Sequence, residues 1–171
     1  MDNFVIHKKI KLLSSNNVIN VYTDGSCINN GKPYACAGIG VYFGPNDPRN
    51  VSTTFTGKQT NNVAELLAII TALNILKEQI ENGQRVNIFT DSTYALRCCT
   101  EYGEKCAKKN WLDAKKRPIK NVELVKTAYE FCRKYPYVTF THIDAHTGRT
   151  DIHSIGNAHA DDLAQLAATK K

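Results

Sequence analysis

The sequence contains no long hydrophobic run, and this absence excludes a helical membrane protein. No apolar stretch reaches the roughly 18 residues that a membrane-spanning helix requires. The chain begins MDNFVIHKKIKLLSS, without the apolar core and small-residue cleavage site of a secretory signal. We therefore expect no membrane partner and an intracellular, cytoplasmic location. In a eukaryotic cell the nucleus is the alternative compartment.

The chain also lacks the cysteine patterns of zinc-binding and disulfide-stapled proteins. Its six cysteines include no C-x-x-C pair, and six in 171 residues is below the density of a secreted disulfide scaffold. We predict reduced, mostly buried thiols and no zinc site made of cysteine.

Internal repeats and low-complexity segments are absent as well. A length of 171 residues with 42% hydrophobic residues suits one domain with an ordinary core. We expect a polar N-terminal lead-in over residues 1–17, with an extra strand at residues 4–6 left open, and a single folded domain over residues 18–171.

Positive charge is concentrated in one part of the chain. The formal net charge is +6, and residues 101–120 include seven basic and three acidic side chains, which is +4 of that total. Such a segment by itself is typical of a solvated helix face. Trp111 stands inside it, and an exposed aromatic ring among cations is typical of a groove that binds a sugar-phosphate backbone. A polyanionic partner is the resulting hypothesis.

Strand and helix patterns follow one another in an order that predicts an α/β fold. Three consecutive strands with short turns predict an antiparallel meander, and a strand that follows a crossover helix predicts a parallel neighbour. We expect a mixed five-stranded sheet, three antiparallel strands and then parallel additions, flanked by helices on both faces. The predicted strands are 18–23, 37–43, 51–57, 85–90 and 135–143; the predicted helices are 61–79, one capped at 91 or 92 and ending near 102, 122–133 and 157–168, with an optional short helix in the basic segment.

Two aspartates stand at the ends of strand-like runs, in VINVYTDGSC and VNIFTDSTYA. If these strands are parallel neighbours, Asp24 and Asp91 lie toward their carboxyl ends, where open sheets of this kind bind ligands. Each residue also has a plainer interpretation. Asp-Gly is a common hairpin turn, and Asp91 can cap the helix that follows it.

Two further acids lie on predicted helices. Glu65 shares a helical stripe with Ile69, Ala72 and Leu76, at i+4, i+7 and i+11, so folding would bury its charge. Asp161, in NAHADDLAQLAA, lies on a helix with an apolar stripe of its own and is alternatively a plain exposed acid.

Buried carboxylates that converge repel each other unless a cation lies between them. Oxygen ligands suit hard cations such as Mg²⁺ and Mn²⁺. Two such ions, roughly 3.5 to 4 Å apart, can activate a water and neutralise the leaving oxygen of a phosphodiester. We therefore predict a divalent-cation site.

A histidine zinc site is the competing interpretation, because His142 and His146 stand four residues apart. In an extended strand that spacing is too long for two side chains to hold one ion, which disfavours zinc. His146 instead opens a polar, glycine-containing loop, where an imidazole beside a metal site can move protons near neutral pH.

These residues match a known family: the chain resembles type 1 ribonuclease H, which cuts the RNA strand of RNA/DNA hybrids. The resemblance covers residues 18–168, and its motifs stand in the family's order at compatible spacing. Each motif alone is moderate evidence, but five in order are strong. The motifs are YTDGSC, TNNVAEL, TDSTY, WLDAKKRPIKNVEL, and AHTG followed by GNAHADDLA.

The resemblance implies a ribonuclease H-like fold and a metal-dependent endonuclease that leaves 5′-phosphate and 3′-hydroxyl ends by a two-metal-ion mechanism. It implies that two Mg²⁺ ions, with Mn²⁺ as a substitute, are bound by Asp24, Glu65, Asp91 and Asp161. It also implies that His146 assists proton transfer or product departure. Residues 18–171 are then the catalytic domain, which we expect to act as a monomer.

The resemblance further implies where the RNA/DNA hybrid binds. Asn30 and Thr60 match positions near a phosphate of the DNA strand, and Asn62 matches a position near bases or riboses. The basic segment resembles a protrusion with which some members grip the hybrid. In this segment the residues assigned to hybrid binding are Trp111, Lys115, Lys116, Arg117 and Lys120. Sensing 2′-hydroxyls and phosphate geometry selects a substrate by shape.

Two other functions stay open. A binding or structural module that has lost the chemistry would have no reason to keep four like charges together. A related nuclease or integrase of the same fold, acting on DNA, is disfavoured by the TNN motif before Glu65 and by the basic segment.

Overall fold

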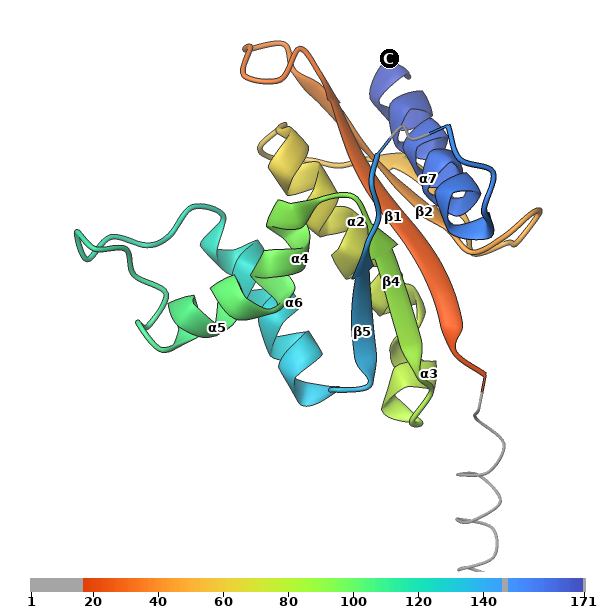
Figure 1. Ribbon diagram of the computed structural model, residues 1–171. Helices are drawn as coiled ribbons and strands as arrows, with labels where there is room; N and C mark the ends of the chain where they lie inside the picture. The colour runs from red at the N-terminus through yellow and green to blue at the C-terminus, as the bar shows by residue number, and fades with distance from the viewer. Residues whose placement is uncertain (1–16, 146–147, 171) are drawn as a thin grey trace, which may run out of the picture.

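The computed structural model describes residues 17–145 and 148–170 (Figure 1). Within these ranges the chain forms one five-stranded sheet in the order β3-β2-β1-β4-β5. The extra strand considered at residues 4–6 lies outside the described residues. The strands are β1 (Ile19–Ile28), β2 (Cys36–Tyr42), β3 (Val51–Thr54), β4 (Val86–Thr90) and β5 (Val138–His142).

The sheet is mixed, as the sequence predicts. β2 pairs antiparallel with β1 and β3, whereas β4 pairs parallel with β1 and β5. β1 is therefore the strand at which the antiparallel meander meets the parallel half. Tyr22 of β1 is in register with Phe89 of β4, so the residues that follow each of them lie close together.

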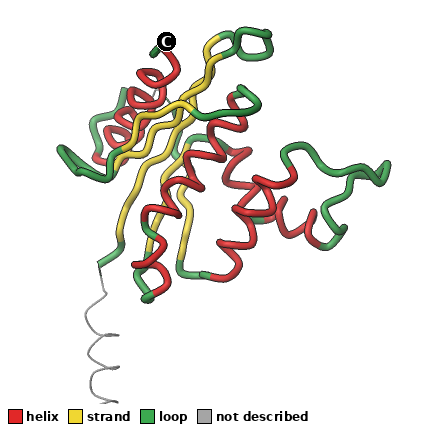
Figure 2. The backbone as a smooth tube through the Cα atoms, turned by 180° about the vertical axis from the view of Figure 1, so that it is seen from behind, coloured by secondary structure: helices red, strands yellow, loops and turns green. Residues whose placement is uncertain are grey.

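Helices cover both faces of the sheet (Figures 1 and 2). On one face α2 packs against β1 and β2, with α4 and α6 beside it, and α7 packs on the other face. Side chains alternate along each strand, so Val21 and Ile88 join the core under α2 while Tyr22 and Phe89 face α7. The helices are α2 (Asn61–Ile75), α3 (Lys77–Glu81), α4 (Thr93–Cys99), α5 (Glu101–Ala107), α6 (Val122–Lys134) and α7 (Ile152–Thr169).

Two of the predicted helices are shorter than expected. The helix predicted over 61–79 is two helices, because Leu76 has φ −92° and ψ 4° and interrupts the regular backbone. The helix predicted to end near 102 stops at Cys99, because Thr100 has φ −126° and ψ −115°, outside the helical region. The optional helix in the basic segment is α5, which begins after this break.

Helix caps account for the differences at the starts of two helices. The last helix begins at Ile152, not near residue 157, because the Asp151 carboxylate accepts hydrogen bonds from two backbone N–H groups of the first turn. Asparagine is a common helix cap, and the sequence alone favours Asn61 as the cap of α2. The cap is instead Thr60, one residue earlier, whose hydroxyl accepts from the N–H of Val63.

Two glycines let helices approach the sheet closely. A Cβ atom at Gly25 of β1 would overlap the backbone of Ala64 and Glu65 in α2, and one at Gly40 of β2 would overlap the backbone of Ala160 in α7. Since only glycine leaves this space free, these positions bring both helices onto the central strands, and they bring Glu65 next to β1.

The described ranges contain no helix long and apolar enough to cross a bilayer. All six cysteines are free, which agrees with the reduced thiols predicted from the sequence. Cys98, Cys99, Cys106 and Cys132 are buried, and Cys27 and Cys36 are half-buried.

Candidate active site

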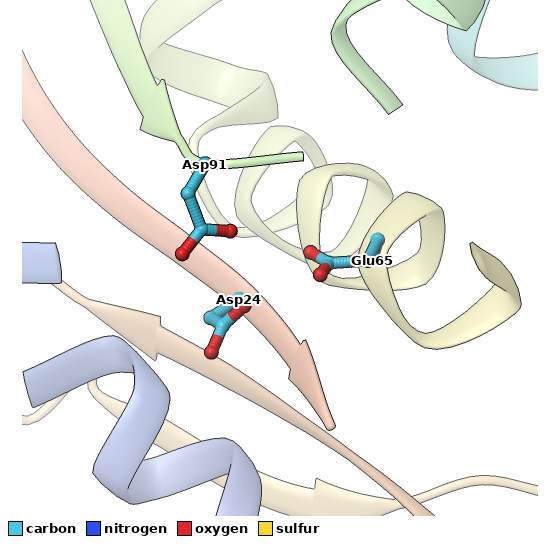
Figure 3. A group of neighbouring side chains, drawn as sticks. All are labelled: Asp24, Glu65 and Asp91. Carbon is cyan, nitrogen blue, oxygen red and sulfur yellow. The ribbon is translucent and has the colours of Figure 1, made fainter. Parts of the chain in front are cut away.

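Three carboxylates from three different elements meet at the junction of β1, β4 and α2 (Figure 3). Asp24 lies within β1, Glu65 in the first half of α2, and Asp91 directly after β4. One oxygen of each lies within 4.8 Å of the others. Asp24 and Glu65 are each only 5% exposed, and Asp91 is half-buried. The convergence predicted from the sequence is therefore confirmed for these three residues.

Asp161 reaches the cluster from the opposite face of the sheet. It lies on α7, is half-buried, and hydrogen-bonds to Asp24. Gln165, one turn further along α7, donates from Nε2 to both carboxylate oxygens of Asp161, at 2.8 and 2.9 Å. The alternative of a plain exposed acid is therefore wrong, because Asp161 contacts a buried member of the cluster.

The plainer interpretations of the two strand-end aspartates also fail. Asp24 and Gly25 lie inside β1, paired with Gly40 and Ile39 of β2, so they form no hairpin turn. The cap of α4 is Ser92, whose hydroxyl accepts from the N–H of Ala95 at 3.1 Å. The Asp91 carboxylate therefore does not cap α4 and lies with Asp24 and Glu65.

Local geometry fixes the orientation of Glu65. The residue lies on the buried stripe that the sequence predicts, because Ile69, Ala72 and Leu76 are all fully buried. Its Oε2 accepts a hydrogen bond of 3.1 Å from the backbone N–H of Gly25. The same close approach that needs glycine at this position therefore also aims the Glu65 carboxylate at β1.

The cluster holds protons more tightly than separate carboxylates do. Burial, the charge of Asp91 and the hydrogen bond and charge of Asp161 raise the pKa of Asp24 to about 8. Burial, followed by the charges of Asp24 and Asp91, raises the pKa of Glu65 well above its ordinary value. A divalent cation would replace these protons and remove the repulsion. The donors are all oxygens, which fits a hard cation.

Two side chains that the sequence argument did not assign hold Asp91. Asn157 of α7 donates from Nδ2 to Asp91 Oδ2 at 3.1 Å. His142 donates from Nε2 to the backbone carbonyl of Asp91, at 3.1 Å. The spacing of Asn157, four residues before Asp161, was the available signal, since helix residues four apart share a face. His142 was considered only for zinc, and the cluster found among the described residues contains no histidine.

His146, the predicted proton carrier, lies outside the described residues. Its role stays a prediction.

Three predicted nucleic-acid contacts gather at the amino-terminal end of α2, close to Glu65. Thr60 caps the helix, and Asn62 is exposed in its first turn. Asn30, in the β1–β2 loop, accepts a hydrogen bond of 3.3 Å from the N–H of Asn61. Residues from the β1–β2 loop and from the start of α2 thus form one polar surface beside the cluster.

The basic segment forms α5 and an extended loop that projects from the helical side of the molecule (Figure 1). Lys115, Lys116 and Lys120 are exposed. Arg117 is also exposed but pairs with Asp113 at 2.9 Å, which braces the loop. The α5 part matches the solvated-face alternative, with an exposed i,i+4 ion pair, whereas the loop lysines are free to meet a partner.

Trp111 differs from its prediction as an exposed ring. It is half-buried, belongs to the edge of the main core and packs edge-on against Tyr129, with ring centroids 5.9 Å apart. A large apolar ring gains more from this core than from water, so Trp111 anchors the base of the loop.

The strand order, the parallel pairing of β1 with β4 and the acidic cluster beside these two strands together define the class of ribonuclease H-like folds. The chain belongs to the RNase H family, whose profile matches residues 16–169, and relatives named ribonuclease H1 place it with type 1.

Relatives and solved structures agree with this assignment. The chain is 37% identical over 151 residues to a ribonuclease H of Schizosaccharomyces pombe, covering 88% of this chain and 53% of that protein. It is 35% identical to the ribonuclease H of Bartonella bacilliformis, covering 93% and 94%. The solved PFV RNase H domain superposes with a TM-score of 0.66 at 28% identity, over 87% of this chain and 93% of that one. The chain spans about half the length of the eukaryotic relatives it matches.

Proposed function

We propose that this protein is an endonuclease that hydrolyses the RNA strand of RNA/DNA hybrids. The observation that carries the proposal is the meeting of Asp24, Glu65 and Asp91 within 4.8 Å, two of them almost fully buried. Membership of the RNase H family supports the substrate. LC11-RNase H1, matched at 25% identity with a TM-score of 0.61, has also been solved in complex with an RNA/DNA hybrid.

In the proposed mechanism Asp24, Glu65, Asp91 and Asp161 hold two Mg²⁺ ions, with Mn²⁺ as a substitute. Bound there, the ions would supply charge stabilisation and a nucleophilic water for an in-line displacement, and the products would carry 5′-phosphate and 3′-hydroxyl ends. Asn30, Thr60 and Asn62 position the backbone of the hybrid beside the acids, and the loop lysines attract its phosphates. His146 is proposed to carry a proton as the product leaves.

Cleavage is expected to require both the hybrid and the cation. We expect end-labelled RNA/DNA hybrid to be cut in Mg²⁺, and duplex DNA and single-stranded RNA to stay intact, because recognition depends on the shape of a mixed duplex. The variant Asp91→Asn should cut nothing, since it removes one metal-facing charge. The measurement is a gel assay of all three substrates with Mg²⁺ and with chelator.

Each of the other outcomes of this assay would indicate a different function for the protein. Equal cutting of duplex DNA would indicate a DNA nuclease of the same fold. No cutting of any substrate would indicate a binding module, and activity in chelator would exclude the proposed chemistry.

The loop lysines are expected to contribute affinity without contributing chemistry. The plot of log K for hybrid binding against log salt has a negative slope. Replacing Lys115 and Lys116 by alanine should make this slope less steep by about 2, because each lysine releases about one counterion. Arg117 is left in place because it braces the loop through Asp113. Binding of labelled hybrid is measured from low to high salt by fluorescence anisotropy.

The matched control is Lys77→Ala with Lys134→Ala, which removes the same charge from exposed positions on α3 and α6. A similar change of slope in both double variants would assign the effect to net charge, not to the loop.

A further inference from the structure

Asn157 is a buried polar residue, and the nitrogen and the oxygen of its side-chain amide have unequal surroundings. It is 4% exposed. Its Nδ2 donates to Asp91 Oδ2 at 3.1 Å, while its Oδ1 is buried without a hydrogen-bond partner, the only such side-chain atom found in residues 17–145 and 148–170. An unpaired buried amide oxygen costs on the order of 1–3 kcal/mol. Native proteins seldom keep one without a reason.

The orientation of this amide follows from its neighbour. An ionised carboxylate can only accept hydrogen bonds, so the NH₂ end of Asn157 must face Asp91 and the oxygen must face elsewhere. Turning the amide over would place two acceptors together. The unpaired oxygen is therefore a consequence of holding Asp91, and turning the amide over would not pair it.

The fold holds Asn157 firmly in this place. The preceding Gly156 lies against the ring of Tyr22, where a Cβ would overlap it, so the start of α7 sits directly on β1. Asp161, four residues later, points from the same helix face. Asp91 is held on its other side, because His142 binds its backbone carbonyl. Helix α7 thus carries both the Asp161 carboxylate and the Asn157 amide, which orients the carboxylate of Asp91.

We propose that Asn157 is a positioning residue: it fixes the Asp91 carboxylate for the divalent cation, and its amide oxygen accepts a hydrogen bond from a water of the hydrated cation. This inference rests on the proposed function. Magnesium retains several of its waters when proteins bind it, so the ion brings the donor that the amide oxygen lacks. Side chains that orient metal ligands in this way are a regular part of such sites.

The test is to replace Asn157 by leucine, which has a similar volume and removes both polar ends. Isothermal titration of the nucleic-acid-free protein with Mg²⁺ should show affinity lowered by about 10- to 100-fold, the range for lost ligand-orienting contacts. At a fixed low Mg²⁺ concentration kcat should fall, and added Mg²⁺ should restore part of it. KM for the hybrid should change by less than about twofold, because the variant leaves the nucleic-acid contacts in place.

A second variant and a stability measurement separate positioning from folding. The melting temperature of cation-free Asn157→Leu should equal or exceed that of the wild type, because the unpaired oxygen is gone. If leucine prevents folding, Asn157→Ser is titrated instead, with the same expectation. The matched control is Gln79→Ala, which removes an exposed amide from α3, a helix that supplies no carboxylate of the cluster. Its Mg²⁺ affinity should stay within about twofold of the wild type.

The outcomes distinguish this inference from the proposed function. Wild-type Mg²⁺ affinity in the folded Asn157 variants would overturn the positioning role while leaving the nuclease proposal intact. A lower melting temperature of the variants with unchanged Mg²⁺ affinity would show that Asn157 has a structural role only. If the wild-type protein binds no Mg²⁺, both proposals fail. If it binds Mg²⁺ but cuts no hybrid, only the nuclease proposal fails.

Discussion

Replacing Asp24 by asparagine is expected to abolish cleavage and, at the same time, to stabilise the cation-free protein. Burial raises the pKa of Asp24 most, and the charges of Asp91 and Asp161 raise it further, so the repulsion within the cluster acts on this residue. Without its carboxylate the cation loses a central ligand, and we expect activity on the hybrid to fall by at least about 10³-fold. The repulsion that it shares with its neighbours disappears as well.

The stability gain should be measurable at neutral pH. Because the pKa of Asp24 is about 8, the wild-type chain must bind a proton there to fold at pH 7, whereas asparagine needs none. The variant is therefore expected to stabilise the cation-free fold by about 2 kcal/mol, or about 4–8 °C in Tm for a chain of this length. Calorimetric melting in chelator and a gel assay in Mg²⁺ give the two readouts. The matched control is Asp162→Asn, an exposed neighbour of Asp161 on α7, which should alter neither. An Asp24→Asn protein that melts lower than the wild type in chelator would contradict the account of the cluster as a strained site.

Stability of the cation-free protein is expected to fall as pH rises from about 5 to about 8.5. The pKa of Asp24 is about 8 in the folded protein against an ordinary value of 3.8, and that of Glu65 is also raised. The folded state therefore binds more protons than the unfolded chain between these values. The stabilisation is fully present below the unfolded pKa and is lost as pH passes the folded pKa. The loss from Asp24 alone should be about 4 kcal/mol.

Saturating Mg²⁺ should remove this dependence, because the cation favours the ionised carboxylates that high pH produces. Urea unfolding at several pH values, in chelator and in Mg²⁺, measures both curves. The variant Asp24→Asn should show a much flatter curve in chelator. Stability in chelator that is constant or increases over this range would mean that the carboxylates are already ionised and solvated, against their burial.

How much of the site could be predicted depended on each residue's place in a local pattern. Glu65 was identifiable because helix periodicity set it among Ile69, Ala72 and Leu76, and no local structure explains a charge there. Asp24 and Asp91 were harder, because a turn and a helix cap explain them equally well at the level of sequence. The structure decided between these interpretations by placing Gly25 inside a strand and giving the cap to Ser92.

Errors arose where long-range packing changes a local tendency. Trp111 lies among lysines in the sequence, yet its ring finds Tyr129 of α6 and is half-buried, because apolar area is buried wherever the fold offers a partner. Thr100 itself is neither proline nor glycine. Gly103, one turn later, lets α5 lie against the Cys98 carbonyl and against Tyr129 of α6, a contact between residues far apart in the chain.

The sequence by itself determined the period of each element and the identity of the acids, because these depend on neighbours a few residues away. The mixed pairing of the sheet followed from the order of strands and helices along the chain, because a crossover helix favours a parallel neighbour. Only the tertiary structure decided that Asn157 and His142 hold Asp91, and that α7 brings Asp161 to Asp24 from the far face of the sheet. Those contacts join residues more than 50 positions apart. The contacts of α7 also depend on Gly40 of β2, which lets that helix close on the strands, a fit that no local pattern encodes.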